Sequence, residues 1–204
     1  MDKLFRFSKL TAIITLASAV LFAVFSLIQI FTIHSYADPL ESVIYGSILS
    51  VPMILKFIEI ATIAVFFGLI YKFSVNGSPL RKPAVIGIIS AVIGCVSIIL
   101  ANTLSILILI SSILYVIGFS ISFIWLSIYF NEKKIKQLCI VYAVFHLLVQ
   151  ILSFEFIYNH FWYLGEGGMY SYFIIHTLLV TSRMIILSVF YHMFYKMSTR
   201  KIFN

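Results

Sequence analysis

The sequence predicts an all-α, polytopic membrane protein that forms one domain, a bundle of six transmembrane helices with both termini on the cytoplasmic side. Three observations support this fold class. Hydrophobic residues make up 62% of the 204 residues and charged residues only 10%, whereas a soluble domain carries about 25% charged residues. Six apolar runs have the length of a membrane span, and nearly all basic residues fall on one side of the membrane when these runs are threaded through it.

The six apolar runs match the length of a transmembrane helix, because a helix needs roughly 20 apolar residues to cross the hydrocarbon core. Alternation with period two over ten-residue segments, which would indicate barrel strands, is absent. Continuous helices also satisfy their own backbone polar groups inside lipid. The predicted spans are about 10–33, 45–71, 84–102, 105–130, 138–158 and 171–195.

The first run follows the basic residues Lys3, Arg6 and Lys9 and could be a signal peptide cleaved after Ala37. The hydrophobic region of a signal peptide spans about 7–15 residues, and this run is longer, so we predict a retained helix. Several small polar residues share one helical face of this run, within an arc of about 80°. Such a stripe is more typical of a helix–helix contact than of a hydrated path. Its members are Thr11, Thr15, Ser18, Ser26 and Gln29.

The second run, 45–71, contains Pro52 one turn before Lys56. A proline inside a helix removes a backbone hydrogen bond and kinks the helix. The kink is either a packing feature, which membrane helices tolerate, or an opening beside a charged site, as in broken transporter helices. The third run carries small residues on one face, which predicts close helix packing. They are Gly87, Ser90, Ala91, Gly94 and Ala101.

The last three runs, 105–130, 138–158 and 171–195, are separated by the basic stretch "NEKKIK" and by the aromatic stretch "YNHFWY". Aromatic residues near the ends of membrane spans are typical of an interfacial belt. Cys95 and Cys139 lie in different runs without CxxC spacing, so we interpret both as small packing residues.

Basic residues determine the predicted orientation. Twelve of the 14 Lys and Arg residues lie at the two termini, in the loop "YKFSVNGSPLRKP" or in "NEKKIK", and the three other loops contain none. The positive-inside rule therefore places both termini in the cytoplasm, and we expect a bacterial inner (plasma) membrane. The formal charge of +7 does not indicate nucleic-acid binding, because the charges are spread over four edges. We expect them to contact anionic lipid headgroups.

Polar side chains also lie near the middle of the predicted spans. Counted from the cytoplasmic ends, Glu59 and Arg183 both lie about 18 Å deep, Gln150 about 20 Å, Lys56 about 22 Å and His146 about 13 Å. An isolated charge at the bilayer centre costs about 2.5–3.5 kcal/mol even on insertion scales. We therefore expect these side chains to point away from lipid and to meet one another.

The spacings indicate how such a cluster could form. Lys56 and Glu59 are three residues apart and can meet on one helical face. Glu59 and Arg183 can pair if the second and sixth spans are neighbours. His146 and Gln150 are four residues apart and share a face. We predict that all five residues form one central polar cluster.

The sequence disfavours two kinds of cofactor site, a haem site and a zinc site. His176 shares the helical face of Arg183 and joins the candidate site, but it differs in depth from His146 by more than about 10 Å, which disfavours a bis-histidine haem. The acidic and histidine residues on the external side match no zinc spacing; they are His34, Asp38, Glu41, Glu155, His160 and Glu166. No motif of a hydrolase, metalloprotease or nucleotide-binding loop is present. We predict no metal and no cofactor.

Three classes of function remain open. The first, which we favour, is a small-solute or ion transporter, channel or permease subunit whose site is the central cluster. Two basic residues against one carboxylate would leave a net positive site, which an anionic substrate group or a neutral Lys56 would relieve. The second is a non-catalytic scaffold or accessory subunit, in which the charges pair fully or face a partner.

The third class is an intramembrane enzyme with Glu59 or His146 as acid or base. Such an enzyme should show a polar pocket that opens to one side. We expect the lipid bilayer as the surroundings, and a homo-oligomer or an energising membrane subunit as a possible partner.

Overall fold

The structure, a computed structural model, describes residues 2–32, 39–99, 105–153 and 155–196. This part of the chain is helical, and no strand occurs in it. Six of its helices are long and apolar enough to cross a membrane, which confirms the predicted fold class. The helices are α1 (Asp2–Thr32), α2 (Pro39–Phe73), α3 (Arg81–Ile99), α4 (Ser105–Tyr129), α5 (Lys133–Leu152), the short α6 (Glu155–Tyr163) and α7 (Gly165–Lys196).

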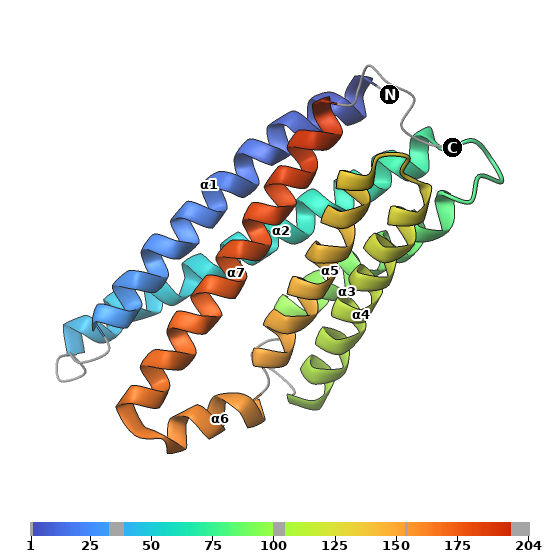
Figure 1. Ribbon diagram of the computed structural model, residues 1–204. Coiled ribbons are helices and arrows are strands. Elements are labelled where there is room, and N and C mark those ends of the chain that lie inside the picture. The colour runs from blue at the N-terminus through green and yellow to red at the C-terminus, as the bar shows by residue number, and fades with distance from the viewer. Residues whose placement is uncertain (1, 33–38, 100–104, 154, 197–204) are drawn as a thin grey trace.

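The six long helices form a closed ring. Each packs against two others, in the order α1, α2, α3, α4, α5, α7 and back to α1. The start of α1 and the end of α7 lie at the same end of the bundle, and α6 lies across the opposite end between α5 and α7 (Figure 1). Among the described residues, α2 and α7 are not closely packed neighbours, so their side chains meet only across the interior of the ring.

Several helix boundaries differ from the predicted spans, and two of the differences have a local explanation. The helix α2 begins at Pro39, earlier than expected, which agrees with the preference of proline for the first position of a helix. The helix α5 ends at Leu152, where the backbone N–H and hydroxyl of Ser153 both donate to the carbonyl of Val149. The predicted span 138–158 therefore runs across the break between α5 and α6.

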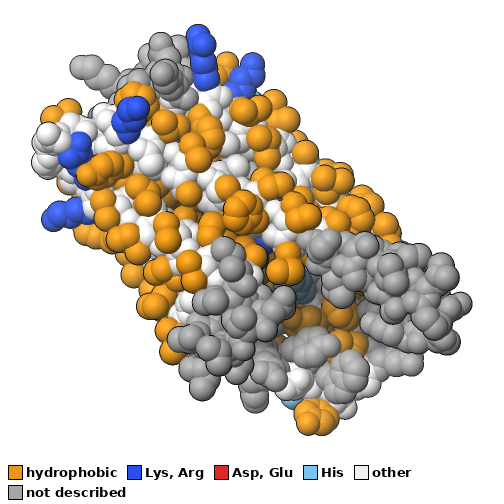
Figure 2. Space-filling model, turned by 180° about the vertical axis from the view of Figure 1, so that it is seen from behind, with side chains coloured by type: hydrophobic (Ala, Val, Ile, Leu, Met, Phe, Trp, Pro, Cys, Tyr) orange, Lys and Arg blue, Asp and Glu red, His pale blue; other side chains and the backbone are white. Residues whose placement is uncertain are grey.

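The outer surface of the long helices is apolar. Leu10, Ile13 and Val20 on α1, for example, each expose about half of their surface or more. Apolar side chains cover most of the face seen in Figure 2, and the basic side chains gather at one end. A soluble monomer rarely exposes apolar patches beyond a few hundred Å², whereas lipid solvates them. These surfaces indicate a multi-pass integral membrane protein.

Aromatic side chains fill the interior of the ring toward the end that carries the basic residues. Their rings meet edge to face, with centroids 5.3–5.9 Å apart for Phe66–Phe194, Phe66–Phe190, Phe123–Phe190 and Phe130–Phe194, a favoured geometry for aromatic pairs. Each of these side chains is fully buried. We define this aromatic cluster as Phe66, Phe123, Phe130, Phe190 and Phe194. It joins α2, α7 and the C-terminal part of α4 with the residue that follows it, and it fills that half of the ring.

Two stripes of small residues mediate helix packing. The described members of the α1 stripe are buried, and Thr11 and Thr15 donate to carbonyls of their own helix. The hydroxyl of Ser188 on α7 donates to the carbonyl of Ala12 at 2.6 Å. On α3, a Cβ at Gly87 would overlap the ring of Phe67 from α2. The side chain of Gln29 and the residue Ala101 lie outside the described part.

We predict that Gly87→Ala destabilises the protein. The added methyl group must displace the ring of Phe67, which is itself fully buried, and overpacking of this kind costs about 1–3 kcal/mol. The melting temperature in detergent should fall. Gly68→Ala is the matched control, because no atom lies within 4 Å of a Cβ built there; an equal fall in both variants would contradict the packing argument.

The orientation of the bundle remains a prediction that a labelling experiment can test. The loop residue Asn76 lies at the basic end and Leu164 at the α6 end, and both are exposed. In a background without Cys95 and Cys139, we expect Leu164→Cys to react with an impermeant maleimide on intact cells and Asn76→Cys to react only after permeabilisation. The reverse pattern would place the termini outside.

Candidate functional site

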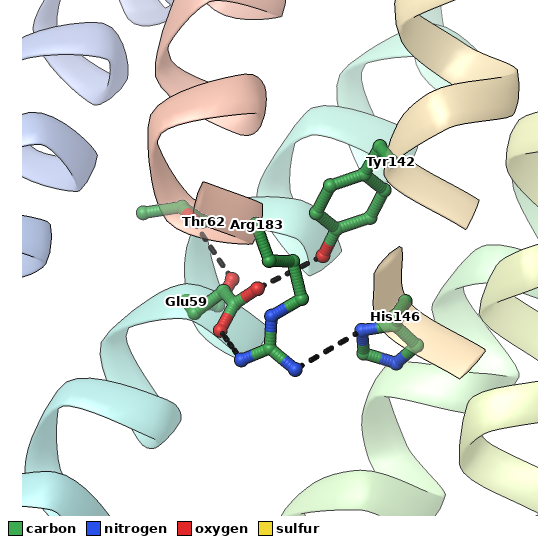
Figure 3. Close-up of polar contacts among 5 residues, drawn as sticks. All are labelled: Glu59, Thr62, Tyr142, His146 and Arg183. Atoms are coloured by element: carbon green, nitrogen blue, oxygen red, sulfur yellow. Dashed lines mark hydrogen bonds and ion pairs between the residues drawn. The ribbon is translucent and has the colours of Figure 1, made fainter. Parts of the chain in front are cut away.

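Three polar side chains meet at one depth in the ring. Glu59 lies 14 residues before the end of α2 at Phe73, Arg183 lies 13 residues before the end of α7 at Lys196, and His146 lies 13 residues after the start of α5 at Lys133. At about 1.5 Å per residue, each lies about 20 Å from the basic end. Figure 3 shows the three side chains converging from their helices.

An ion pair between Glu59 and Arg183 crosses the ring. Arg183 Nη2 lies 2.5 Å from Glu59 Oε2, and the two residues are only 1% and 5% exposed. The second carboxylate oxygen, Oε1, accepts a hydrogen bond from the hydroxyl of Tyr142 on α5 at 2.9 Å. Each carboxylate oxygen thus has a donor, which is the condition under which a buried charge is tolerated.

His146 supports the other side of the guanidinium. Its Nδ1 lies 3.4 Å from Arg183 Nη1. Because a guanidinium can only donate, Nδ1 is the acceptor in this contact, which leaves the ring proton of the neutral imidazole on Nε2. The ring is stacked on Tyr142 and lies edge-on to Tyr115, at centroid distances of 5.7 and 5.2 Å. Nε2 has no hydrogen-bond partner in the described part of the chain.

A cavity of about 200 Å³ begins at Arg183 and extends toward the α6 end. Its lining residues precede Glu59 on α2 and follow His146 on α5, and on α7 they run from His176 to Met184. Blue and pale-blue side chains are visible in the hollow on the face drawn in Figure 2. The lining residues are Phe22, Pro52, Met53, Lys56, Tyr115, Val149, Gln150, Ser153, His176, Val180, Arg183 and Met184.

The cavity is lined by two strongly basic side chains and by no described acidic one. Lys56 and Arg183 face it, whereas Glu59 does not line it, because Glu59 lies behind the guanidinium. The ammonium of Lys56 forms no ion pair with a described residue, and it lies 6.0 Å from the ring centroid of Tyr115. The expected contact between Lys56 and Glu59 is therefore not formed, since the carboxylate is turned toward Arg183.

The remaining candidate residues are placed as follows. Gln150 and His176 line the cavity, while His146 lies behind it. His176 is stacked on Tyr172 at a centroid distance of 5.8 Å. His160 is exposed on α6. The residues His34, Asp38 and Glu41, and the side chains of Glu155 and Glu166, lie outside the described part. Within that part, no group of three or more potential metal ligands occurs.

Two tyrosines of the site were missed in the sequence. Tyr142 lies four residues before His146 and therefore shares its helical face, so the same spacing that joins His146 to Gln150 could have identified it. Tyr115 is 2% exposed, lines the cavity and has no partner for its hydroxyl among the described residues. In the sequence, only the position of Tyr115 near the middle of the fourth apolar run could have indicated that it belongs to the site.

Comparison of the chain with protein-family models, with curated proteins and with solved structures finds no match. The ion pair, the cavity and the basic side chains that line it are therefore the features from which a function can be inferred.

We predict strong coupling between Glu59 and Arg183 in stability. Glu59→Leu or Arg183→Met alone leaves one buried charge unpaired and should lower the free energy of unfolding by about 3–5 kcal/mol. The double variant should recover most of this loss, because neither member of the pair is left without its partner. Unfolding in detergent measures all three variants, with Glu132→Leu at the half-buried start of α5 as the control. Additive losses would show that the pair is not coupled.

Proposed function

We propose that the chain is a membrane transport protein, either a transporter, a channel or a permease subunit, which admits a small polar solute to a site at mid-membrane depth. The observation that carries the proposal is the cavity that extends from Arg183 toward the α6 end and is lined by Lys56, whose side chain forms no ion pair with a described residue. We further propose that it resides in a bacterial inner membrane with cytoplasmic termini, as the distribution of basic residues indicates.

The charge of Lys56 supports a binding role over a packing role. Glu59 alone compensates Arg183, and the pair is complete without a second cation. A charged side chain in the middle of a membrane costs about 2.5–3.5 kcal/mol or more. Polar groups at this depth generally face a water-filled path or a ligand site, and Lys56 lines the cavity.

The shape of the interior supports a site with access from one side. The cavity extends toward the α6 end, while the aromatic cluster fills the ring toward the basic end. A solute that enters from the α6 end would meet Lys56 and Arg183 before it meets this cluster. Passage to the other side would require the aromatic cluster to open, which is the alternation of access that transporters use.

Two observations favour the other classes of function. The complete pairing of Glu59 with Arg183 and Tyr142 is what a packing network in a scaffold requires. The one-sided cavity is a feature expected of an enzyme. However, Glu59 and His146, the candidate acid and base, do not line the cavity, and a general acid or base must come within hydrogen-bond reach of the substrate. Transport therefore stands first.

We predict that purified protein in liposomes accelerates the entry of at least one small polar solute. The test measures the swelling of vesicles in solutions of one solute at a time. The neutral solutes are glycerol and glycine. The anions are lactate and chloride, given as potassium salts with valinomycin so that potassium can follow the anion. Gln150→Trp, which fills part of the cavity, should abolish the acceleration. Leu148→Trp is the matched control, because Leu148 lies on the exposed face of the same helix. Entry rates equal to those of protein-free vesicles for every solute would contradict transport and favour a scaffold.

A further inference from the structure

We infer that the ligand of the cavity is a small organic monoanion, whose carboxylate lies between the ammonium of Lys56 and the guanidinium of Arg183. This inference rests on the proposed function, since it names the class of solute that the same site would take. It goes further by assigning the recognition of the anionic group to Lys56, Arg183 and Tyr115.

The balance of charge favours an anion that carries one negative charge. The described residues around the centre supply two cations, Lys56 and Arg183, and one carboxylate, Glu59, which is already engaged by Arg183. With Lys56 protonated, one positive charge is left over, and it faces the cavity. Because an unpaired charge is costly at this depth, a bound monoanion would stabilise the site, whereas a cation would be repelled.

Two donors in the lining of the cavity lack a partner in the described part of the chain, and the lining also includes Gln150, Ser153 and His176, which can donate or accept. Arg183 Nε and the hydroxyl of Tyr115 are buried without a partner among the described residues, and both residues line the cavity at 5% and 2% exposure. Lys56 adds an ammonium with three N–H groups. A carboxylate accepts about four hydrogen bonds and donates none, so its chemistry is complementary to this set.

The guanidinium of Arg183 is held in place for this role. Glu59 fixes Nη2 and His146 fixes Nη1, while Tyr142 orients the carboxylate of Glu59. Two of the five N–H groups of the guanidinium are thus committed, and Nε is not. A site whose donors are fixed before binding loses little conformational freedom when the ligand arrives.

The size and walls of the cavity limit the rest of the ligand. A volume of about 200 Å³ is smaller than the roughly 300–1,000 Å³ typical of drug-sized ligands. It corresponds to about six or seven water molecules at about 30 Å³ each. The walls beside the charged groups are apolar and include Phe22, Val149 and Met184. A carboxylate with a short aliphatic chain fits both the charge and the walls.

The test uses sodium butyrate as the probe and thermal stability of the full-length protein in detergent as the readout. Sodium chloride is exchanged for sodium butyrate at constant ionic strength, and butyramide serves as a neutral analogue of the same shape. A ligand that binds only the folded state raises the melting temperature with its concentration. We expect butyrate to raise it and butyramide not to do so.

The variants identify the groups that recognise the anion. The Lys56→Met variant should need at least about tenfold more butyrate for the same rise in melting temperature, because a hydrogen bond to a charged group is removed. Tyr115→Phe keeps the ring and should weaken binding severalfold. Lys72→Met is the matched control, because Lys72 is an exposed lysine in the last turn of the same helix, and it should behave like the unchanged protein.

Three outcomes would overturn the inference: no rise with butyrate, an equal rise with butyramide, or an unchanged butyrate response in Lys56→Met. A rise with oleate but not with butyrate would assign the carboxylate to a membrane lipid and would also overturn it.

Failure of the proposed function is distinguishable from these results. Butyrate binding without entry of any solute into vesicles would contradict transport alone, whereas entry of neutral solutes without butyrate binding would contradict the anion site alone.

Discussion

The ion pair between Glu59 and Arg183 is the interaction on which the interior of the bundle depends. It joins α2 and α7, which are not packed neighbours in the described part of the ring. Neither charge is tolerable alone at this depth. Tyr142 and His146 add contacts from α5. The ion pair, together with these two contacts from α5, therefore fixes how the three helices are rotated about their own axes.

The same pair divides the interior into two halves with different chemistry. Toward the basic end, the aromatic cluster excludes solvent and packs edge to face. Toward the α6 end, the interior is hollow and carries the positive charge of Lys56. Because Glu59 lies behind the guanidinium, the hollow half is lined by cations even though a carboxylate is only one side chain away. In the proposed site, the preference for an anion would follow from which side of the ion pair faces the cavity.

Composition and the lengths of the apolar runs were sufficient to predict the class of fold, because they depend only on what lipid tolerates. Counting residues placed Glu59 and Arg183 at the same depth, and these side chains do pair. The partner of Lys56 was not predictable, because a spacing of three residues permits a contact but does not fix the rotation of a helix. The end of α5 was not visible either, since four of the six residues after Leu152 are aromatic or aliphatic.

The closure of the ring by α1 and α7 has a consequence for how the protein is assembled. The helix α1 is synthesised before α7 and packs against it, through Ser188 and Ala12 and through Lys9, which lies 5.5 Å from the ring of Tyr195. Glu59 likewise waits for a counter-ion that is synthesised more than a hundred residues later. Until α7 has been synthesised, α1 lacks the helix it packs against and Glu59 lacks its counter-ion, so a chain without α7 would leave both facing lipid.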